Sequence, residues 1–394
     1  MKEGWVNKTL GEIATEMYRG SGIKRDQVTK EGTPCVRYGE IYTTYDISFN
    51  TCVSHTSMQN IASPKYFEHG DLLFAITGES VEDIGKTIAY LGNDKCLCGG
   101  DIICMKHRQN PKYLAYVLST PDAIRQKGIG KTKLKVVHTN APALKAISIP
   151  LAPLPEQQSI VDYLDSAFAK IDAMKANAEK ALNEAKALFQ ASLKEMLEPK
   201  EGWEEKTLKD VSVIHGNYGL SVPSTEFNGV RYLRITDITE WGDLNDEKVS
   251  AKLDEEKEQE LLEEGDILFA RTGATVGKTL MYKEAFGKCL FAGYLIRYRL
   301  KKEMILPKFL FYITHSDNYY KWVLENQKAA AQPNISAKLY NEYLVLYPPL
   351  SEQQSIVATL DSLKSKVDRL QANYDKISQE CDALKQAILR QVFE

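Results

Sequence analysis

The chain has 394 residues, which is more than one ordinary hydrophobic core organises, so two or more domains are expected. Its 43% hydrophobic and 26% charged residues are typical of a globular protein in water, and no run of about 18 apolar residues predicts a membrane span. The net charge of −3 does not by itself favour a nucleic-acid partner. The N-terminal residues contain no apolar signal core, which predicts a cytoplasmic protein.

The first segment, residues 1–150, is rich in Gly, Pro, Thr and Tyr. Short apolar runs such as GDLLFAITG (70–78) predict strands mixed with short helices. Trp5 stands beside an apolar strand start, where burial is expected in preference to base stacking. We therefore predict an α+β domain over residues 1–150.

The second segment, residues 151–198, is predicted to be one long helix. Residues 156–198 contain neither Gly nor Pro and consist mainly of strong helix formers, while Pro153 and Pro155 mark the start. Apolar residues recur about every 3.6 positions, which is the period of a straight helix with one apolar face. That face includes Ile160, Leu164, Ile171, Leu182 and Phe189.

The third segment, residues 199–349, repeats the first. KEGW (2–5) returns at 200–203, GDLLFAITG returns as GDILFARTG (265–273), and the GKT of 85–87 returns at 277–279. The offset stays between 192 and 198, so both segments should share one architecture. Apolar runs at 266–270 and 294–300 predict strands in this second α+β domain.

The fourth segment, residues 350–394, repeats the helix. EQQSIV (156–161) recurs at 352–357, and a Leu-Asp pair follows in both copies, at 164–165 and 360–361. Ser351 and Gln354 have the spacing of a capping box, which predicts the helix start. The apolar residues alternate by four and three, the heptad pattern of a coiled coil. They include Ile356, Leu360, Leu363, Val367, Leu370, Ile377, Leu384 and Ile388.

The two predicted helices can cover each other. Each apolar face would be exposed alone, and the repeat supplies a partner within the same chain. The first helix leads from the first domain into the second, so a second helix returning antiparallel to it would create a pseudo-two-fold axis. We therefore predict an α+β fold in which two globular domains are separated by two long antiparallel coiled-coil helices.

Taken together, these motifs resemble the specificity subunits of type I restriction-modification systems. In that family, each of two target-recognition domains is closed by a proline-rich stretch, a Glu-Gln-Gln-x-Ile-Val helix start and a long helix. Here the matching stretches are 153–161 and 348–357, and the Gly-Trp and GD(L/I)LFA…TG motifs also match. The resemblance covers essentially the whole chain.

The resemblance implies a non-catalytic subunit that binds a two-part double-stranded DNA target with a fixed nonspecific spacer. It implies two modification (methyltransferase) subunits as partners, and restriction subunits (ATP-dependent translocase and nuclease) in the full complex. S-adenosylmethionine, ATP and Mg²⁺ would belong to those partners, with no cofactor bound by this chain. A pseudo-two-fold protein can hold two identical subunits symmetrically, and rigid helices can fix the distance between half-sites.

Candidate DNA contacts are polar and basic side chains in glycine-containing loops, because these groups reach phosphates and base edges. The last such stretch of each half, just before the helix, is the strongest candidate. For any single residue, a solvated loop charge is an equal alternative. The first half supplies Arg19, Lys24, Arg25, Arg37, Thr77, Lys86, Lys131, Thr132, Lys133 and Lys135. The second half supplies Asn217, Tyr218, Arg231, Arg234, Arg271, Thr272, Lys278, Lys328, Gln332, Asn334 and Ser336.

Two motifs suggest other chemistry. RTGATVGKT (271–279) resembles a phosphate-binding loop, but three residues separate its glycines where that loop needs four. Cys96, Cys98, Cys104 and His107 lack the paired spacing of a zinc site, so we expect buried thiols and no metal. The seven cysteines are odd in number and irregularly spaced, which argues against a disulfide framework.

Two further interpretations of the function stay open. The chain could be an interaction protein whose coiled coil and repeated domains bind proteins, which predicts no salt-sensitive DNA affinity. Alternatively, it could be an enzyme that uses the Gly-Lys-Thr loops, which predicts nucleotide binding. Only the specificity-subunit interpretation accounts together for the duplication, the paired helices and the absence of a recognisable catalytic motif.

Overall fold

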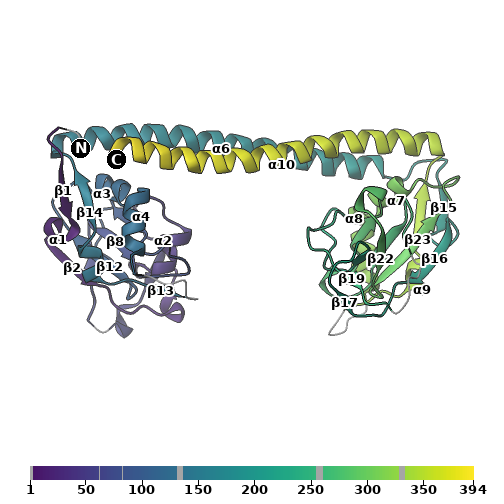
Figure 1. Ribbon diagram of the computed structural model, residues 1–394, viewed down its shortest axis with the longest axis horizontal. Coiled ribbons are helices and arrows are strands. Elements are labelled where there is room, and N and C mark those ends of the chain that lie inside the picture. Colours follow the sequence, from purple (N-terminus) through teal and green to yellow (C-terminus); the bar gives the residue numbers. More distant parts are fainter. Residues whose placement is uncertain (1–2, 62, 82, 131–135, 254–260, 328–332) are drawn as a thin grey trace. The chain divides into compact units, whose positions relative to one another are not determined.

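The computed structural model describes residues 3–61, 63–81, 83–130, 136–253, 261–327 and 333–394 (Figure 1). The chain folds into two compact units. Unit 1 comprises Met1–Ala178 with Tyr374–Glu394, and unit 2 comprises Glu179–Asn373. Each unit thus contains one β-rich domain and part of each long helix. In the described residues, no helix combines the length and apolar character needed to cross a membrane.

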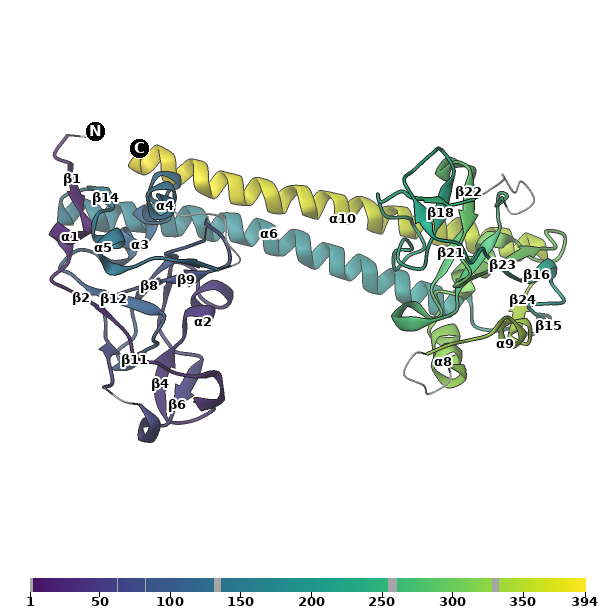
Figure 2. The same ribbon diagram turned by 60° about the horizontal axis from the view of Figure 1, so that its bottom comes forward.

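Unit 1 contains two five-stranded sheets, and Figure 2 shows β4, β6 and β11 farther from the long helices than β8 and β12. The first sheet has the order β2 (Glu16–Arg19), β12 (Ile102–Lys106), β8 (Leu72–Ala75), β10 (Thr87–Tyr90) and β5 (Ser48–Phe49). The second has the order β3 (Val28–Thr29), β6 (Ser54–Thr56), β4 (Thr33–Val36), β11 (Cys96–Cys98) and β7 (Tyr66–Phe67). Only β10–β5 and β4–β11 pair in parallel among these strands.

The first sheet of unit 1 is buried on both faces, and β8 shows how its sequence achieves this. Leu72 and Phe74 point into a core shared with the helices, whereas Leu73 and Ala75 point into a core shared with the second sheet. Successive strand residues face opposite sides, so an uninterrupted apolar run is what a doubly covered strand requires.

Shorter elements complete unit 1. Strand β1 (Val6–Thr9) pairs with β14 (Ser148–Leu151), and β9 (Thr77–Gly78) pairs with β13 (Val137–His138). The helices are α1 (Leu10–Ile13), α2 (Tyr38–Thr43), α3 (Pro111–Val117), α4 (Pro121–Gly128) and α5 (Ala141–Lys145), with 3₁₀ turns η1 (Arg25–Gln27) and η2 (Met58–Asn60).

Unit 2 has a similar arrangement with smaller sheets. Its main sheet has the order β16 (Ser212–Tyr218), β23 (Leu295–Leu300), β20 (Ile267–Ala270) and β21 (Thr279–Met281), so the strands predicted over 266–270 and 294–300 are confirmed. The smaller pairs are β15 (Glu204–Thr207) with β24 (Leu344–Tyr347), β17 (Ser224–Thr225) with β19 (Ser250–Ala251), and β18 (Arg231–Leu233) with β22 (Cys289–Phe291). The helices are α7 (Pro307–Ile313), α8 (Asp317–Asn326) and α9 (Ala337–Asn341), with 3₁₀ turns η4 (Gly273–Thr275) and η5 (Glu284–Phe286).

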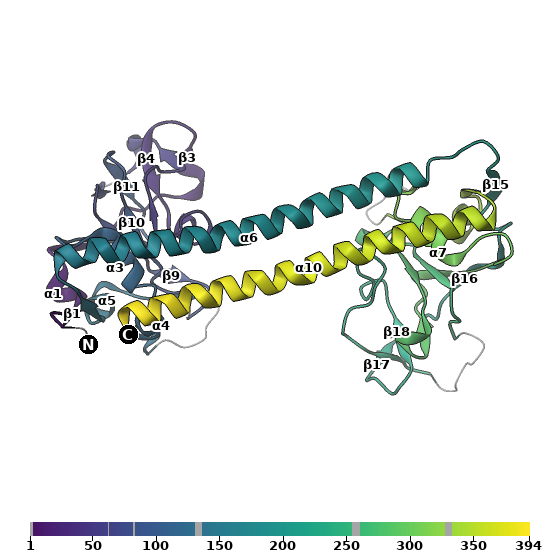
Figure 3. The same ribbon diagram turned by 90° about the horizontal axis from the view of Figure 1, so that it is seen from above.

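The two long helices are α6 (Leu154–Met196) and α10 (Leu350–Phe393), and Figure 3 shows them side by side. The capping box predicted at Ser351 and Gln354 is wrong, because the helix already begins at Leu350. The carbonyl of Pro349 accepts the hydrogen bonds of Glu352 N and Gln353 N instead. Pro153 does the same for the start of α6, so a proline carbonyl begins both helices.

The helix pair is antiparallel within each unit. In unit 1, Lys385 pairs with Asp172 at 2.6 Å, and Lys175 pairs with Asp382 at 3.8 Å. In unit 2, Lys186 Nζ donates to Gln371 Oε1 at 2.8 Å. Residue numbers therefore fall along one helix as they rise along the other.

The residues predicted for the helix contact differ in burial. Those buried are Leu164, Ile171, Leu182, Phe189, Ile356, Leu360 and Val367, and those partly buried are Ile160, Leu363, Leu370, Ile377 and Ile388. Leu384 departs from the prediction, since 47% of it is exposed. Near its C-terminal end, the inward face of α10 follows steps of four through Cys381, Lys385, Leu389 and Phe393, where it packs on the β-rich domain of unit 1.

Candidate nucleic-acid interface

The loop after the central strand occupies the same place in both units. In unit 1, Thr77 and His138 pair through β9 and β13, and Thr77 Oγ1 lies 3.2 Å from His138 Nδ1. In unit 2, Thr272 and Asn334 form the corresponding antiparallel bridge. The fold therefore presents equivalent backbone positions with different side chains, which is what reading two different half-sites requires.

Three of the predicted DNA contacts lie together at this position in unit 2. The guanidinium of Arg271 lies 4.9 Å from the ring centroid of Tyr218, and Arg271 Nε donates to Asn334 Oδ1 at 3.3 Å. The hydroxyl of Tyr218 accepts a hydrogen bond from Ala337 N at 2.9 Å, which holds the ring in place. Within the described chain, the terminal amino groups of Arg271 have no hydrogen-bond partner. A stacked Arg with free terminal donors is suited to a guanine edge or a phosphate.

In unit 1, several predicted contacts line one hollow of about 250 Å³. Its lining includes Arg19, Lys24, Arg37, Tyr38 and Asp101, together with backbone from three glycines. Arg19 donates to Asp101 Oδ1 at 2.8 Å, so a carboxylate acceptor stands among the cationic donors. Because Asp101 adds an acceptor to these donors, the hollow can pair with both the donors and the acceptors of a base edge.

Other predicted DNA contacts instead bond to groups within their own domain. Arg231 is only 6% exposed and donates to the carbonyls of Asn245 and Glu247, so it does not reach the surface as predicted. Arg234 forms ion pairs with Asp237 at 2.7 Å and Glu247 at 3.1 Å, which occupy much of its guanidinium.

Lys86 and Ser336 also have structural partners. Lys86 Nζ donates to the carbonyl of Tyr45 at 2.9 Å, and burial lowers the pKa of this amine. Ser336 Oγ accepts from Leu339 N at 3.3 Å and so caps the start of α9. These bonds leave both side chains less able to contact DNA.

Of the remaining predicted contacts, some lie in the described part of the chain and others lie outside it. Lys24 and Arg25 are exposed, whereas Asn217 and Lys278 are half-buried. Six lie outside the described residues: Lys131, Thr132, Lys133, Lys135, Lys328 and Gln332. The strongest sequence candidates are therefore represented here by Asn334 and Ser336 alone.

Two residues at these sites were missed by sequence reasoning. His138 in unit 1 occupies the position of Asn334 in unit 2, and Asp101 closes the unit 1 hollow. The sequence criteria covered Arg, Lys, amide and hydroxyl side chains, and these criteria pass over both residues. Aligning the two repeats with the offset of 196 that relates EQQSIV at 156–161 to EQQSIV at 352–357 would have pointed to His138, since position 138 then corresponds to position 334.

The Gly-Lys-Thr motifs do not form phosphate-binding loops. Such a loop leads into a helix whose N-terminus faces the phosphates. Here Thr87 begins strand β10 and Thr279 begins strand β21. Gly85 and Gly277 have positive φ angles of 73° and 87°, and a Cβ at either position would meet Lys127 of α4 or Val323 of α8. These glycines therefore allow a helix to pack closely against the loop.

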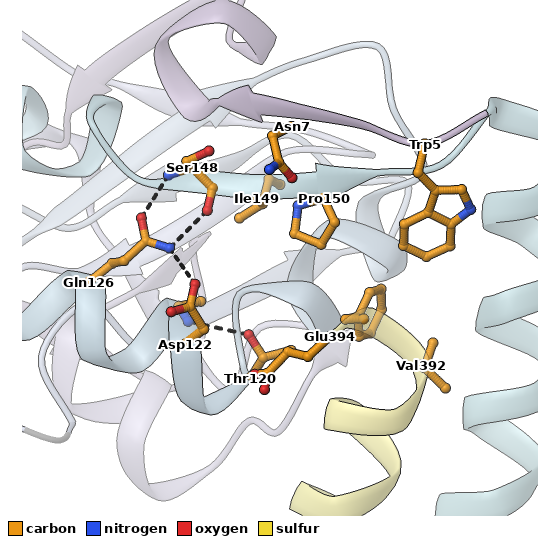
Figure 4. Close-up of a pocket in the computed structure, with 12 residues that line it drawn as sticks. Trp5, Asn7, Thr120, Asp122, Gln126, Ser148, Ile149, Pro150, Val392 and Glu394 are labelled. Carbon is orange, nitrogen blue, oxygen red and sulfur yellow. Dashed lines mark hydrogen bonds between the residues drawn. The ribbon is translucent and has the colours of Figure 1, made fainter. Parts of the chain in front are cut away.

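A larger hollow in unit 1, of about 660 Å³, contains none of the predicted DNA contacts among its described lining residues (Figure 4). Gln126 bridges its polar side, because Gln126 Nε2 donates to Asp122 Oδ2 at 2.7 Å and to the carbonyl of Ser148 at 2.8 Å. Trp5 and Phe393, with ring centroids 6.3 Å apart, form its apolar side. Trp5 is 5% exposed, so its predicted burial is confirmed.

Comparison with known proteins decides the family. The model of the type I restriction modification DNA specificity domain matches residues 2–184 and again residues 200–379. The chain belongs to this family. The double match also bears out the internal repeat, and it assigns the chain as a DNA-specificity subunit of a type I restriction-modification system, which is a non-catalytic subunit of its complex.

Similar specificity subunits are known from enterobacteria. The type I restriction enzyme StySPI specificity subunit of Salmonella potsdam is 23% identical over all of this chain and 89% of its own length. The EcoKI specificity subunit of Escherichia coli strain K12 is 26% identical, again over all of this chain and 89% of its own length. Both alignments run the full length of the present specificity subunit.

Solved structures share the fold. A chain solved in work on complex assembly and conformational transition of the type I restriction-modification system has a TM-score of 0.77 at 20% identity, covering 99% of this chain and 98% of that one. The HsdS subunit from Thermoanaerobacter tengcongensis has a TM-score of 0.57 at 19% identity, covering 100% and 97%. The predicted α+β architecture with two packed long helices is thus the fold of specificity subunits.

Proposed function

We propose that this specificity subunit reads a two-part duplex DNA target, with one half-site read by each β-rich domain. The observation that carries the proposal is the equivalent loop position in the two units, where Thr77 and His138 correspond to Thr272 and Asn334. One backbone frame with different polar groups can present different hydrogen-bond patterns to base edges. We assign residues 1–150 and 199–349 as the two target-recognition domains.

Within each half-site, the proposal distinguishes base contacts from phosphate contacts. Arg271 with Asn334 in unit 2, and Arg19, Arg37 and Asp101 in unit 1, are assigned to base edges. Exposed lysines at the rim, such as Lys24, are assigned to phosphates. Loss of a base contact relaxes the sequence, whereas loss of a phosphate contact weakens binding evenly across sequences.

The internal repeat also suggests the partners. Two similar surfaces on one chain fit two copies of the same modification subunit, in agreement with the family resemblance. Restriction subunits would join this core in the complete complex. S-adenosylmethionine, ATP and Mg²⁺ would be bound by those subunits, because methyl transfer and translocation are their reactions.

Mapping methylated positions in a host that co-expresses the chain with its modification subunit tests this proposal. We expect a two-part motif with a fixed gap. Replacing residues 1–150 by the corresponding segment of another specificity subunit should change one half of the motif only. Replacing residues 199–349 is the matched control and should change only the other half.

Methylation that is independent of both replacements would contradict the proposal and favour the protein-binding alternative. Binding of the complex to DNA should also fall steeply with salt concentration, since phosphate contacts release counterions. A complex whose DNA affinity does not respond to salt would argue against the same proposal.

A further inference from the structure

Both copies of the Glu-Gln-Gln motif bury their first glutamine completely. Gln157 and Gln353 each have 0% exposure, although glutamine is rarely buried. Gln157 Oε1 accepts from Asn110 N at 2.9 Å, and its Nε2 donates to the carbonyl of Ala152 at 2.8 Å and to Gln109 Oε1 at 2.9 Å. The side chain thus joins the first turn of α6 to the segment that precedes α3.

Gln353 repeats these bonds in unit 2. Its Oε1 accepts from Leu306 N at 2.8 Å, and its Nε2 donates to the carbonyls of Met304 at 2.9 Å and Pro348 at 2.8 Å. Every hydrogen-bonding group of the amide is therefore used, as a buried polar group requires. The same helix turn is joined to the same part of the domain in both units.

A second contact follows two helical turns later. Asp165 accepts from Tyr116 OH at 2.6 Å and from Lys112 Nζ at 2.5 Å, both donors lying in α3. Burial, and then the bonded carboxylate, raise the pKa of Tyr116, so its hydroxyl remains a donor. We call Gln157 and Asp165, with these partners, anchor 1.

Unit 2 contains the equivalent arrangement. Asp361 of α10 accepts from Tyr312 OH at 2.5 Å and forms an ion pair with Lys308 Nζ at 3.3 Å, and both donors lie in α7. Burial, followed by the bonded carboxylate, also raises the pKa of Tyr312. Gln353 and Asp361, with these partners, form anchor 2.

The geometry of each anchor opposes both pivoting and sliding of the β-rich domain on its helix. Its two contact points lie eight residues apart on the helix, which corresponds to about 12 Å along the axis at 1.5 Å per residue. One contact alone would let the domain pivot on the helix, whereas two separated contacts oppose both pivoting and sliding. Hydrogen bonds to a charged carboxylate are stronger than neutral ones, which makes the second contact stiff.

We propose that anchors 1 and 2 are positioning sites that make the subunit selective for the number of base pairs between the half-sites. This inference rests on the proposed two-part recognition. Adding one base pair to the spacer moves a half-site by about 3.4 Å and turns it by about 34° around the duplex. A domain that is held on its helix at two points cannot follow this displacement without breaking one contact. By fixing each domain on its helix, the anchors therefore determine which spacer length the subunit accepts.

The test compares methylation by the purified complex on duplexes with the native spacer and with spacers one base pair shorter or longer. Tyr116→Phe combined with Tyr312→Phe removes only two hydroxyls, and Asp165→Asn combined with Asp361→Asn weakens both carboxylate contacts. Glu179→Gln, at an exposed position of α6, is the matched control. Circular dichroism and complex assembly check that each variant folds.

We expect discrimination against the wrong spacers to fall about tenfold in the anchor variants, the factor that corresponds to losing one hydrogen bond to a charged group. Glu179→Gln should keep the native discrimination. A variant that methylates every spacer more slowly but with an unchanged ratio would overturn the inference, because the anchor would then serve folding alone. The proposed function would survive that result, since it fails only if methylation ignores the two half-sites.

Discussion

Replacing Lys127 by methionine is expected to stabilise unit 1 at neutral pH and to lose this effect as the pH rises. Lys127 lies in α4 with 5% exposure, and its Nζ donates to the carbonyl of Leu118 at 2.7 Å and to Thr87 Oγ1 at 3.1 Å. Neither partner carries a charge, and burial lowers the pKa of the amine from 10.5 to about 7. In unit 2, Val323 lies at the corresponding place against Gly277.

The magnitude follows from proton linkage. The unfolded chain keeps Lys127 protonated up to pH 10.5, whereas the folded chain does so only up to about pH 7. The unfolded state therefore binds more protons between these values, and the free energy of unfolding rises with pH across this window. The penalty is complete below pH 7, amounts to about 4 kcal/mol at pH 7, and falls to about 2 kcal/mol at pH 9.

Methionine removes this penalty but also removes two hydrogen bonds, at a cost of about 1 to 2 kcal/mol. We expect Lys127→Met to gain about 2 to 3 kcal/mol at pH 7 and close to nothing at pH 9. Hydrogen exchange of α3 and α4 peptides in urea measures unfolding of unit 1 separately from unit 2. Lys145→Met, at an exposed position of α5, is the control. A variant whose stability gain is the same at both pH values would refute the reasoning.

Five further substitutions test the recognition loops and the helix pair. Arg271→Ala should cost about 1 to 3 kcal/mol of base discrimination at one position of the half-site read by unit 2, leaving the other half unchanged in methylation maps. Gly277→Ala should destabilise unit 2 by about 3 kcal/mol, because the positive φ is strained and the new Cβ lies 2.8 Å from a Val323 methyl carbon. Gly85→Ala should cost only about 1 kcal/mol, because the lysine side chain that it meets can move aside. Thermal unfolding of both variants checks that Gly277→Ala is the more destabilising of the two. Leu360→Ala should cost about 2 to 5 kcal/mol and Leu384→Ala less than about 0.5 kcal/mol in urea unfolding, since only Leu360 is fully buried.

Much of the architecture could be predicted because it depends on residue patterns that act locally. The absence of Gly and Pro over 156–198 and 352–394, together with the repeated motifs, was enough to predict two long helices that pack together. The first residue of each helix was harder, because the carbonyl of Pro349 replaces the side-chain cap that Ser351 suggested. Leu384 was misplaced because the heptad pattern was extended to a part of α10 that packs on the β-rich domain of unit 1.

The candidate site was less predictable, since the role of a basic side chain depends on neighbours that are distant in sequence. Arg231 and Arg271 look alike in glycine-containing loops. Only the fold shows that Arg231 is enclosed by backbone carbonyls, whereas Arg271 lies over Tyr218 with its terminal donors free among the described residues. The anchors were present in the sequence as repeated Gln and Asp, but their partners in α3 and α7 come from the divergent domains.

The way α10 completes unit 1 has a consequence for biosynthesis. Cys381, Leu389 and Phe393 belong to the same core as Trp5 and strand β8, yet the whole of unit 2 is translated between them. Contacts of such long sequence separation form slowly, and a growing chain exposes the surface they will cover. During synthesis on the ribosome, the apolar surface of the first β-rich domain therefore remains exposed until α10 has been made. Chaperone binding to nascent chains should accordingly persist after residues 1–150 have emerged.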